Sequence, residues 1–303
     1  ISAASRTLAK PALDRLARLM TASGFAGVIP AAEVQQLLAE TGLTLPQLML
    51  ALCPFAALYS VAPISNFHVG AISCGASGNL YYGANMEFPD QPLSFCTHAE
   101  QSATVNAWMN GETGLGSIAV NQAPCGYCRQ FLYETVSAAT LEVILSNGTV
   151  PLTTLLPAAF GPQDLGVQGA LLTPYTHGLS LVEPNPDPGI AAALAAANSA
   201  YAPYTSSYAG VALVTAGGIY AAPLAENAAY NPSMSPLEAA LSQLNLSGNP
   251  YGSITQVALV EVEGAEVSQL DVTEAVASTV TDAPMIVGYA AAPATRPERA
   301  RRP

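Results

Sequence analysis

Basic residues are nearly absent from the body of this 303-residue chain. Residues 19–295 contain a single basic residue, Arg129, against 19 of the 21 acidic residues. A groove that binds a polynucleotide needs several Lys or Arg side chains to neutralise phosphates, so the charge excludes most nucleic-acid-binding functions. The same shortage weighs, less strongly, against a phosphorylated small substrate, because only Arg129 is left to hold a phosphate.

Long apolar runs and a disulfide framework are also missing. No apolar run reaches the roughly 18 residues that a membrane-spanning helix needs, so we expect a globular chain with no membrane partner. The chain has five cysteines, an odd number. Of these, Cys53, Cys74 and Cys96 lie in apolar or strand-like surroundings, without the spacing typical of metal ligands. We interpret these three as buried thiols, which favours a reducing, cytoplasmic compartment.

Two short motifs, His98-Ala99-Glu100 and Pro124-Cys125-Gly126-Tyr127-Cys128, are the most informative part of the chain. His98, Cys125 and Cys128 supply the three nitrogen and sulfur ligands of a catalytic zinc ion whose fourth position stays open. Glu100, close to His98 at the start of a predicted helix, can then move protons beside the metal without binding it. His-x-Glu followed by Pro-Cys-x-x-Cys is a known signature of zinc-dependent nucleobase deaminases.

Arg129 directly follows Cys128. We interpret it as a supporting residue, because positive charge and hydrogen bonds beside two thiolates withdraw electron density from sulfur and restore Lewis acidity to zinc. The alternative is an ordinary surface arginine.

Hydrophobic periodicity predicts an α/β fold with a mixed β-sheet layered between helices. Both motifs fall at predicted helix N-termini, whose dipoles favour thiolates. The predicted helices are 12–20, 31–59, 100–110 and 125–137, and the predicted strands are 66–73, 80–84, 117–120 and 141–145.

The two ends of the chain are its only basic regions. Residues 1–18 hold four basic residues against one acid, Asp14, and the chain does not begin with Met. We favour an amphipathic N-terminal helix here, and the remnant of an organelle-targeting segment is the alternative. Four arginines lie in residues 294–303, which we expect to form a disordered tail.

An internal repeat relates the two halves of the chain. Residues 56–71 resemble 196–213, residues 78–81 resemble 217–220, and 98–103 align with 236–241. This alignment places Pro236 opposite His98 and Glu238 opposite Glu100, and no second Pro-Cys-x-x-Cys follows. The second half is therefore expected to keep the fold without the chemistry, with Glu238 serving as a charge at a helix N-terminus.

The chain resembles the large, two-domain, homodimeric cytidine deaminases from about Gly27 to about Tyr289. The motifs that carry the resemblance are residues 65–71 (SNFHVGA), 82–88 (YGANMEF), 98–103 (HAEQSA), 124–131 (PCGYCRQF), 160–162 (FGP) and 225–229 (AENAA).

The resemblance implies a role for each matching residue. His98, Cys125 and Cys128 would hold one zinc ion per chain, and Glu100 would carry protons to N3 and to the leaving amine. Asn85 and Glu87 match residues that bind the ribose hydroxyls, and Phe67 matches an aromatic that packs on the pyrimidine. The remaining substrate-binding positions are Ala99 and Phe160, the latter inserted from the partner subunit of a homodimer. Gln122 departs from the pattern, because some relatives carry an aromatic residue there.

The expected organisation combines these inferences. We expect a helical N-terminal segment at 1–48, a catalytic zinc deaminase domain at 49–150, a linker at 151–189 that contributes to the dimer, a degenerate deaminase-like domain at 190–293 and a basic tail at 294–303. The expected activity is hydrolytic deamination of cytidine and 2′-deoxycytidine in pyrimidine salvage. The alternatives are a deaminase of another small aminated base or nucleotide, and a non-catalytic zinc-stabilised homodimer.

Overall fold

The computed structural model describes residues 8–293, and the chain divides into two compact units. Unit 1 comprises the chain up to Glu87 together with Cys96–Ala159 and Leu246–Gly248. Its elements are α1 (Lys10–Thr21), β1 (Val28–Ile29), α2 (Ala31–Thr41), α3 (Leu45–Ala56), β2 (Gly70–Gly75), β3 (Leu80–Ala84), α4 (Ala99–Met109), β4 (Leu115–Val120), α5 (Gly126–Tyr133), β5 (Glu142–Leu145), β6 (Gly148–Pro151) and α6 (Leu152–Leu155).

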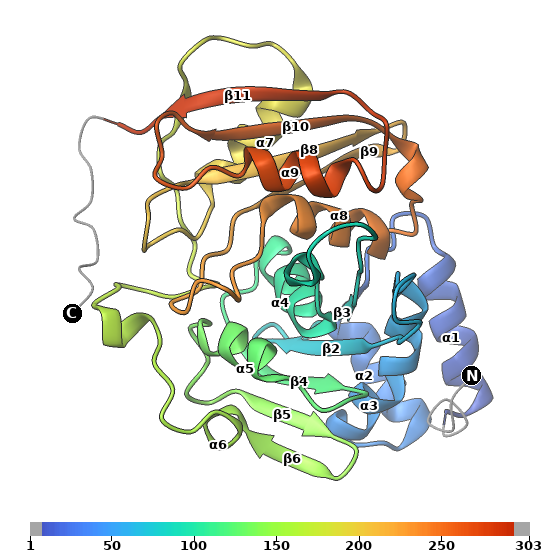
Figure 1. Ribbon diagram of the computed structural model, residues 1–303. Coiled ribbons are helices and arrows are strands. Elements are labelled where there is room, and N and C mark those ends of the chain that lie inside the picture. Colours follow the sequence, from blue (N-terminus) through green and yellow to red (C-terminus); the bar gives the residue numbers. More distant parts are fainter. Residues whose placement is uncertain (1–7, 294–303) are drawn as a thin grey trace. The chain divides into compact units, whose positions relative to one another are not determined.

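Unit 1 is built on a mixed six-stranded sheet in the order β1-β3-β2-β4-β5-β6. Strands β4 and β5 run parallel, and the other neighbours are antiparallel. Ile72 and Cys74 of β2 join the apolar core formed with α1, α2 and α3. Between them, Ser73 points the other way and donates to the Ala103 carbonyl of α4 at 2.9 Å. The sheet is therefore layered between helices, as predicted, and Figure 1 shows the two helical layers.

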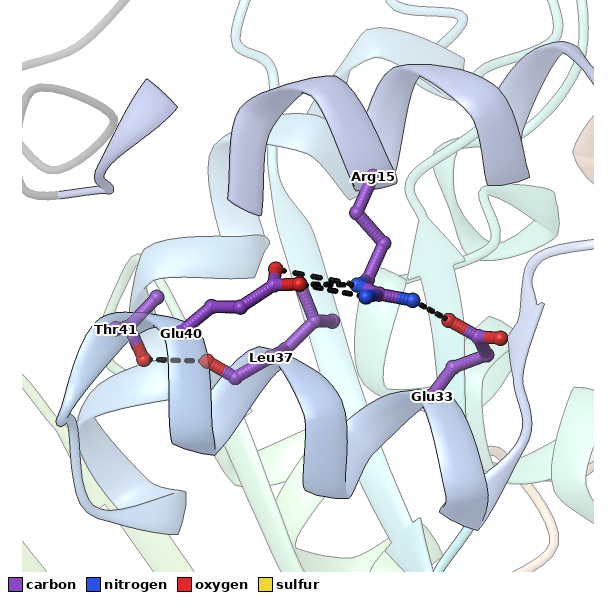
Figure 2. A network of polar contacts seen from close by, with 5 residues as sticks. All are labelled: Arg15, Glu33, Leu37, Glu40 and Thr41. Carbon is purple, nitrogen blue, oxygen red and sulfur yellow. Dashed lines mark hydrogen bonds and ion pairs between the residues drawn. The ribbon is translucent and has the colours of Figure 1, made fainter. Parts of the chain in front are cut away.

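Helix α1 is fastened to α2 by one arginine (Figure 2). Arg15 Nη1 lies 2.8 Å from a Glu33 carboxylate oxygen, and Arg15 Nε donates to Glu40 Oε1 at 3.0 Å. The adjoining face of α1 buries Ala12 and Leu16 in the core of unit 1. The predicted amphipathic helix at 12–20 is confirmed, and it is part of the packed fold.

Unit 2 has a mixed five-stranded sheet in the order β7-β11-β10-β8-β9, in which β10 and β11 are parallel. Helix α7 packs on it through Ile190, Ala193 and Ala197. The elements are β7 (Ser180–Leu181), α7 (Pro188–Asn198), β8 (Ala209–Thr215), β9 (Gly218–Pro223), α8 (Pro236–Leu246), β10 (Ile254–Val262), α9 (Leu270–Ala277) and β11 (Met285–Ala291).

The two units repeat the same local geometry, and the strand registers align them. Gly70 pairs with Ala84 in unit 1, and Gly210 pairs with Pro223 in unit 2. Both glycines lie so close to the backbone of the preceding helix, α3 or α7, that a Cβ atom would clash with it. The predicted internal repeat is thus confirmed around these strands.

The predicted alignment of the zinc-motif helix with α8 is wrong by one residue. The Met86 amide donates to Thr97, and the Ala225 amide donates to Met234 in the same way. Thr97 and Met234 are therefore equivalent positions, and so are the residues that follow them. Ser235, and not Pro236, thus stands in the place of His98. The loop before α8 is two residues shorter than its counterpart before α4, and the sequence alignment shortened it by only one.

This shift also moves the acidic residue. Gln101 accepts a hydrogen bond from the His98 amide at 3.0 Å, and Glu238 accepts one from the Ser235 amide at 2.9 Å. Glu238 therefore corresponds to Gln101, and Leu237 takes the place of Glu100. Glu238 does lie at a helix N-terminus, as expected, but it is no relic of the acid.

Other boundaries differ from the predicted ones for local reasons. The predicted strand 66–73 begins only at Gly70, because Asn66 adopts a left-handed conformation (φ 53°) and the preceding residues form a loop. The predicted helix 125–137 ends at Tyr133. The Pro- and Gly-rich stretch after residue 148 contains β6, α6 and β7. The predicted basic tail lies outside the described residues.

Within residues 8–293, no single helix is long and apolar enough to cross a membrane. Helices Ala31–Thr41 and Leu45–Tyr59 meet the length and composition criteria only as a pair, with a 103° bend between them.

Candidate metal centre

The first half of the site is held on β3. Thr97 pairs with Met86, which places His98 next to the end of that strand, and His98 is the N-cap of α4. A Cβ atom on Gly83 would lie well within 3.0 Å of the Ala99 carbonyl and the Ala103 amide. Only glycine lets the first turn of α4 rest directly on the strand.

The second half of the site follows β4. The pairing of β4 with β2 continues at Asn121, whose side chain accepts the Gly70 amide at 3.1 Å. The chain then turns into α5, with Cys125 as the N-cap, and the Cys125 sulfur accepts the Cys128 amide at 3.4 Å. Strands β3 and β4, which lie on either side of β2, thus carry the two motifs to the same end of the sheet.

The three predicted metal ligands come together at this end of the sheet. The donor atoms of His98, Cys125 and Cys128 all lie within 4.8 Å of one another, and no other such group of three occurs among the described residues. His98 Nδ1 lies 3.1 Å from Cys128 Sγ and 3.5 Å from Cys125 Sγ, and the two sulfurs are 3.6 Å apart.

These distances fit a zinc ion. Tetrahedral zinc with Zn–S near 2.3 Å and Zn–N near 2.0–2.1 Å places two sulfurs about 3.8 Å apart and a nitrogen about 3.5 Å from each sulfur. One histidine and two cysteines are also the donor types that zinc prefers. The chain therefore presents three of four tetrahedral positions.

The two thiols differ in acidity. The contact between the two sulfurs lowers the pKa of Cys125 to about 3 and raises that of Cys128. Burial further raises the pKa of Cys128, whereas Cys125 is exposed. A cation bound between the two sulfurs would hold both as thiolates.

Glu100 lies beside these donors and is not one of the three. Its side chain is buried, with 5% of the residue exposed, and it accepts a hydrogen bond from the Cys128 thiol. Burial raises the pKa of Glu100 above its ordinary value, with its own backbone amide and His98 opposing the shift. A carboxyl group with a raised pKa is suited to accept and return a proton.

Arg129 holds the turn that carries Cys125. Its Nε donates to the Pro124 carbonyl at 2.9 Å and its Nη1 to the Leu155 carbonyl of α6 at 2.8 Å. The guanidinium thus ties the start of α5 to α6. The expected hydrogen bonds to the two sulfurs stay a prediction.

Three of the residues predicted to bind substrate, Phe67, Asn85 and Glu87, lie in a single loop-and-strand cluster. Asn85 and Glu87 flank Met86, whose pairing with Thr97 leads directly to His98. The Asn85 side chain donates to the Phe67 carbonyl and accepts from the Val69 amide, both at 2.9 Å. Phe67 is 53% exposed. Asn85 therefore connects the exposed aromatic to the strand beside the metal centre.

Two predicted substrate-binding positions are of a different kind. Ala99 is buried at the first position of α4, so only its backbone is offered to a ligand. Phe160 belongs to unit 2 and is 45% exposed. Its insertion into a partner subunit stays a prediction.

The sequence reasoning missed several supporting residues. The Tyr127 ring stacks on the His98 imidazole at 5.3 Å between centroids, and Ser60 donates to Asn85 at 2.6 Å. Tyr127 lies inside the Cys-x-x-Cys motif, so its position was available, but a stacking contact depends on the rotamers of both rings. Ser60 is distant in sequence from every motif and carries no signal of its own.

Comparison with known proteins agrees with this geometry. The model of the cytidine and deoxycytidylate deaminase zinc-binding region matches residues 44–143, and a second model of that region matches residues 152–274. A cytidine deaminase from Aeromonas salmonicida is 47% identical over 240 residues, covering 79% of this chain and 82% of its own length. The enzyme from Aliivibrio fischeri is 46% identical, covering 82% and 84%.

Two further matches are more distant. A cytidine deaminase from Vibrio vulnificus is 44% identical over 261 residues, covering 86% of this chain and 88% of its own. The crystal structure of the cytidine deaminase from Mycobacterium tuberculosis has 27% identity and a TM-score of 0.37, covering 39% of this chain and 98% of that one. On the sequence matches, this chain is a two-domain member of the cytidine deaminase family.

Proposed function

We propose that this chain hydrolyses cytidine and 2′-deoxycytidine to uridine and 2′-deoxyuridine with release of ammonia, a reaction of pyrimidine salvage. The observation that carries the proposal is a buried Glu100 beside three zinc-type donor atoms within 4.8 Å of one another. A purely structural zinc site closes all four positions with protein ligands and needs no such acid.

The chain's own residues supply the rest of the mechanism. When bound to His98, Cys125 and Cys128, zinc supplies the Lewis acidity that activates water for attack on C4 of the pyrimidine. Glu100 takes a proton from the attacking water, gives it to N3, and transfers the second proton to the amino group, which leaves as ammonia. Phe67 packs on the base, and Asn85 and Glu87 bind the sugar.

A neutral nucleoside suits this site better than a nucleotide. Arg129 is the only cation in residues 19–295, and two of its guanidinium nitrogens already donate to the carbonyls of Pro124 and Leu155. A phosphate group bound at this site would lack a cationic partner. Turnover of cytidine monophosphate as fast as cytidine would contradict this part of the proposal.

We further propose a homodimer in which Phe160 of the partner subunit completes the site. Support comes from the resemblance and from the exposure of this large apolar side chain. A cytoplasmic location is proposed as well, because Cys125 and Cys128 must stay reduced to hold a metal.

The test combines an absorbance assay for cytidine and deoxycytidine with a zinc determination on the same sample. We expect turnover with about one zinc per chain, since only one copy has the donor set. Glu100→Ala should keep the metal and lose at least about 10²-fold in kcat. Zinc without deamination of either nucleoside, or a Glu100→Ala variant with wild-type turnover, would overturn the proposal.

A further inference from the structure

Both backbone polar groups of Phe67 are held by side chains. The Phe67 amide donates to Ser65 Oγ at 3.0 Å, and its carbonyl accepts from Asn85 Nδ2 at 2.9 Å. Residue 66, between them, takes the left-handed conformation. The exposed Phe67 ring thus belongs to a short loop whose backbone conformation is fixed by these side-chain hydrogen bonds.

Ser65 connects this loop to Glu87. Its hydroxyl donates to one Glu87 carboxylate oxygen, while the other accepts the amides of Ile64 at 2.8 Å and Ser65 at 2.9 Å. Burial acts to raise the pKa of Glu87, but these hydrogen bonds outweigh burial, and the pKa is lowered overall. A serine hydroxyl offers one donor and two acceptor sites, and Ser65 uses the donor on Glu87 and an acceptor on Phe67.

Unit 2 contains the same arrangement around different residues. Glu226 accepts the Tyr204 amide at 2.9 Å and the Thr205 hydroxyl, and Thr205 Oγ1 accepts the Ser207 amide at 3.0 Å. Ser206 repeats the left-handed conformation. Ser207 takes the place of Phe67, so the network persists in a copy that has neither the aromatic nor the metal ligands. Its primary role is therefore to shape the loop.

We propose that Ser65 is a positioning residue that fixes Phe67, and with it the base, relative to Glu87 and the sugar. Ser65 acts through these two residues and does not itself contact the substrate. This inference rests on the proposed function, since it assigns Phe67 to the base and Glu87 to the ribose.

Removing the hydroxyl should loosen the aromatic without removing it. Ser65→Ala leaves the Phe67 amide without its acceptor and Glu87 without one donor. We expect KM for cytidine to rise about five- to tenfold, the usual effect of one lost hydrogen bond, with a smaller change in kcat. Ser65→Thr should keep wild-type kinetics, because Thr205 makes the equivalent contacts.

Thr205→Ala is the matched control. It removes the corresponding hydroxyl from unit 2, so it should change thermal stability in a similar way and leave KM unchanged. If Ser65→Ala does not fold, Ser65→Cys replaces it, because a thiol keeps the size but is a weak hydrogen-bonding group.

A double-mutant cycle with Phe67→Ala tests whether Ser65 acts through the ring. We expect Ser65→Ala to raise KM much less in the Phe67→Ala background than in the wild type. An unchanged KM in Ser65→Ala, fully additive effects, or an equal rise in Thr205→Ala would each overturn the inference. Wild-type protein that fails to deaminate cytidine would instead overturn the proposed function.

Discussion

Glu238 and Gln101 occupy the same position at the starts of α8 and α4, and each closes its helix by accepting the amide of the N-cap residue. The acceptor distances are 2.9 Å for Glu238 and 3.0 Å for Gln101. The two side chains have the same shape and differ in charge. Glu238 is 6% exposed, and burial raises its pKa to about 7.

This difference predicts a pH-dependent stability for unit 2. Because the folded-state pKa of about 7 exceeds the ordinary value of 4.5, folding takes up a proton between these pH values. The stabilisation is complete below about pH 4.5 and is lost as pH rises through 7, at most about 3 kcal/mol in total. Urea unfolding between pH 5 and 8 measures this loss.

Glu238→Gln should remove this pH dependence, because glutamine caps α4 in the same position without a charge. The variant is expected to unfold at higher urea than the wild type at pH 8 and at similar urea near pH 5. A wild-type slope with pH that persists in Glu238→Gln would assign the effect to another group.

Removal of the metal should expose one particular thiol. Cys125 is exposed and its contacts with Cys128 and His98 lower its pKa, whereas Cys53 is buried and burial raises the pKa of its thiol. After treatment with a chelator, we expect iodoacetamide to label Cys125 first, and the activity recovered when zinc is restored to fall in parallel. Mass spectrometry of the labelled peptides measures this order.

The control for the thiol experiment is zinc added back before labelling, which should protect Cys125 at least about tenfold, because a coordinated thiolate is a poor nucleophile. Labelling of Cys53 before Cys125, or equal labelling rates with and without zinc, would contradict the assignment of the ligands.

The sequence was sufficient for the metal ligands and most helices. His98, Cys125 and Cys128 were predicted because a metal requires particular donor atoms at particular spacings, and residue types in the sequence show both directly. Apolar periodicity predicted α1 and α4, but it merged α2 and α3 into one helix, 31–59, which the structure breaks at Gly42, where the backbone is left-handed. The layering of the sheet followed from the alternation of helices and strands.

What the sequence could not supply depends on side-chain geometry. The Glu87–Ser65–Phe67 network uses polar residues that sequence patterns also assign to turns, so only the structure distinguishes a loop from the predicted strand at 66–69. The alignment of Glu238 failed because a shorter loop leaves no mark in composition. Strand β1 has two residues, too few for any periodicity.

Gly83 should not tolerate replacement by a residue with a Cβ atom. A Cβ atom there would clash with the backbone of Ala99 and Ala103, neither of which can move without displacing the first turn of α4. Gly83→Ala should therefore lower the free energy of unfolding by at least about 2 kcal/mol and reduce zinc content. Thermal unfolding and metal analysis measure both effects.

The control is Gly116→Ala on β4, where an added Cβ meets nothing within 4 Å. We expect this variant to match the wild type in stability and zinc content. Equal behaviour of the two variants would show that α4 does not depend on close contact with β3.

Arg15 is predicted to decide whether α1 stays docked. It contacts Glu33 and Glu40 on α2, one residue on each side of its guanidinium (Figure 2). Arg15→Ala should leave two neighbouring carboxylates without their cation and increase hydrogen exchange throughout α1. Arg15→Lys should rescue only part of the protection, because an ammonium group cannot match the fork geometry of a guanidinium.

The control for Arg15 is the pair formed by Lys10 and Asp14 within α1. Their side chains are 83% and 60% exposed, so Lys10→Ala should not change exchange measurably. Equal exchange in Arg15→Ala and the wild type would mean that burial of Ala12 and Leu16 alone holds the helix. Increased exchange confined to α1 would identify Arg15 as the contact that keeps this helix docked on α2.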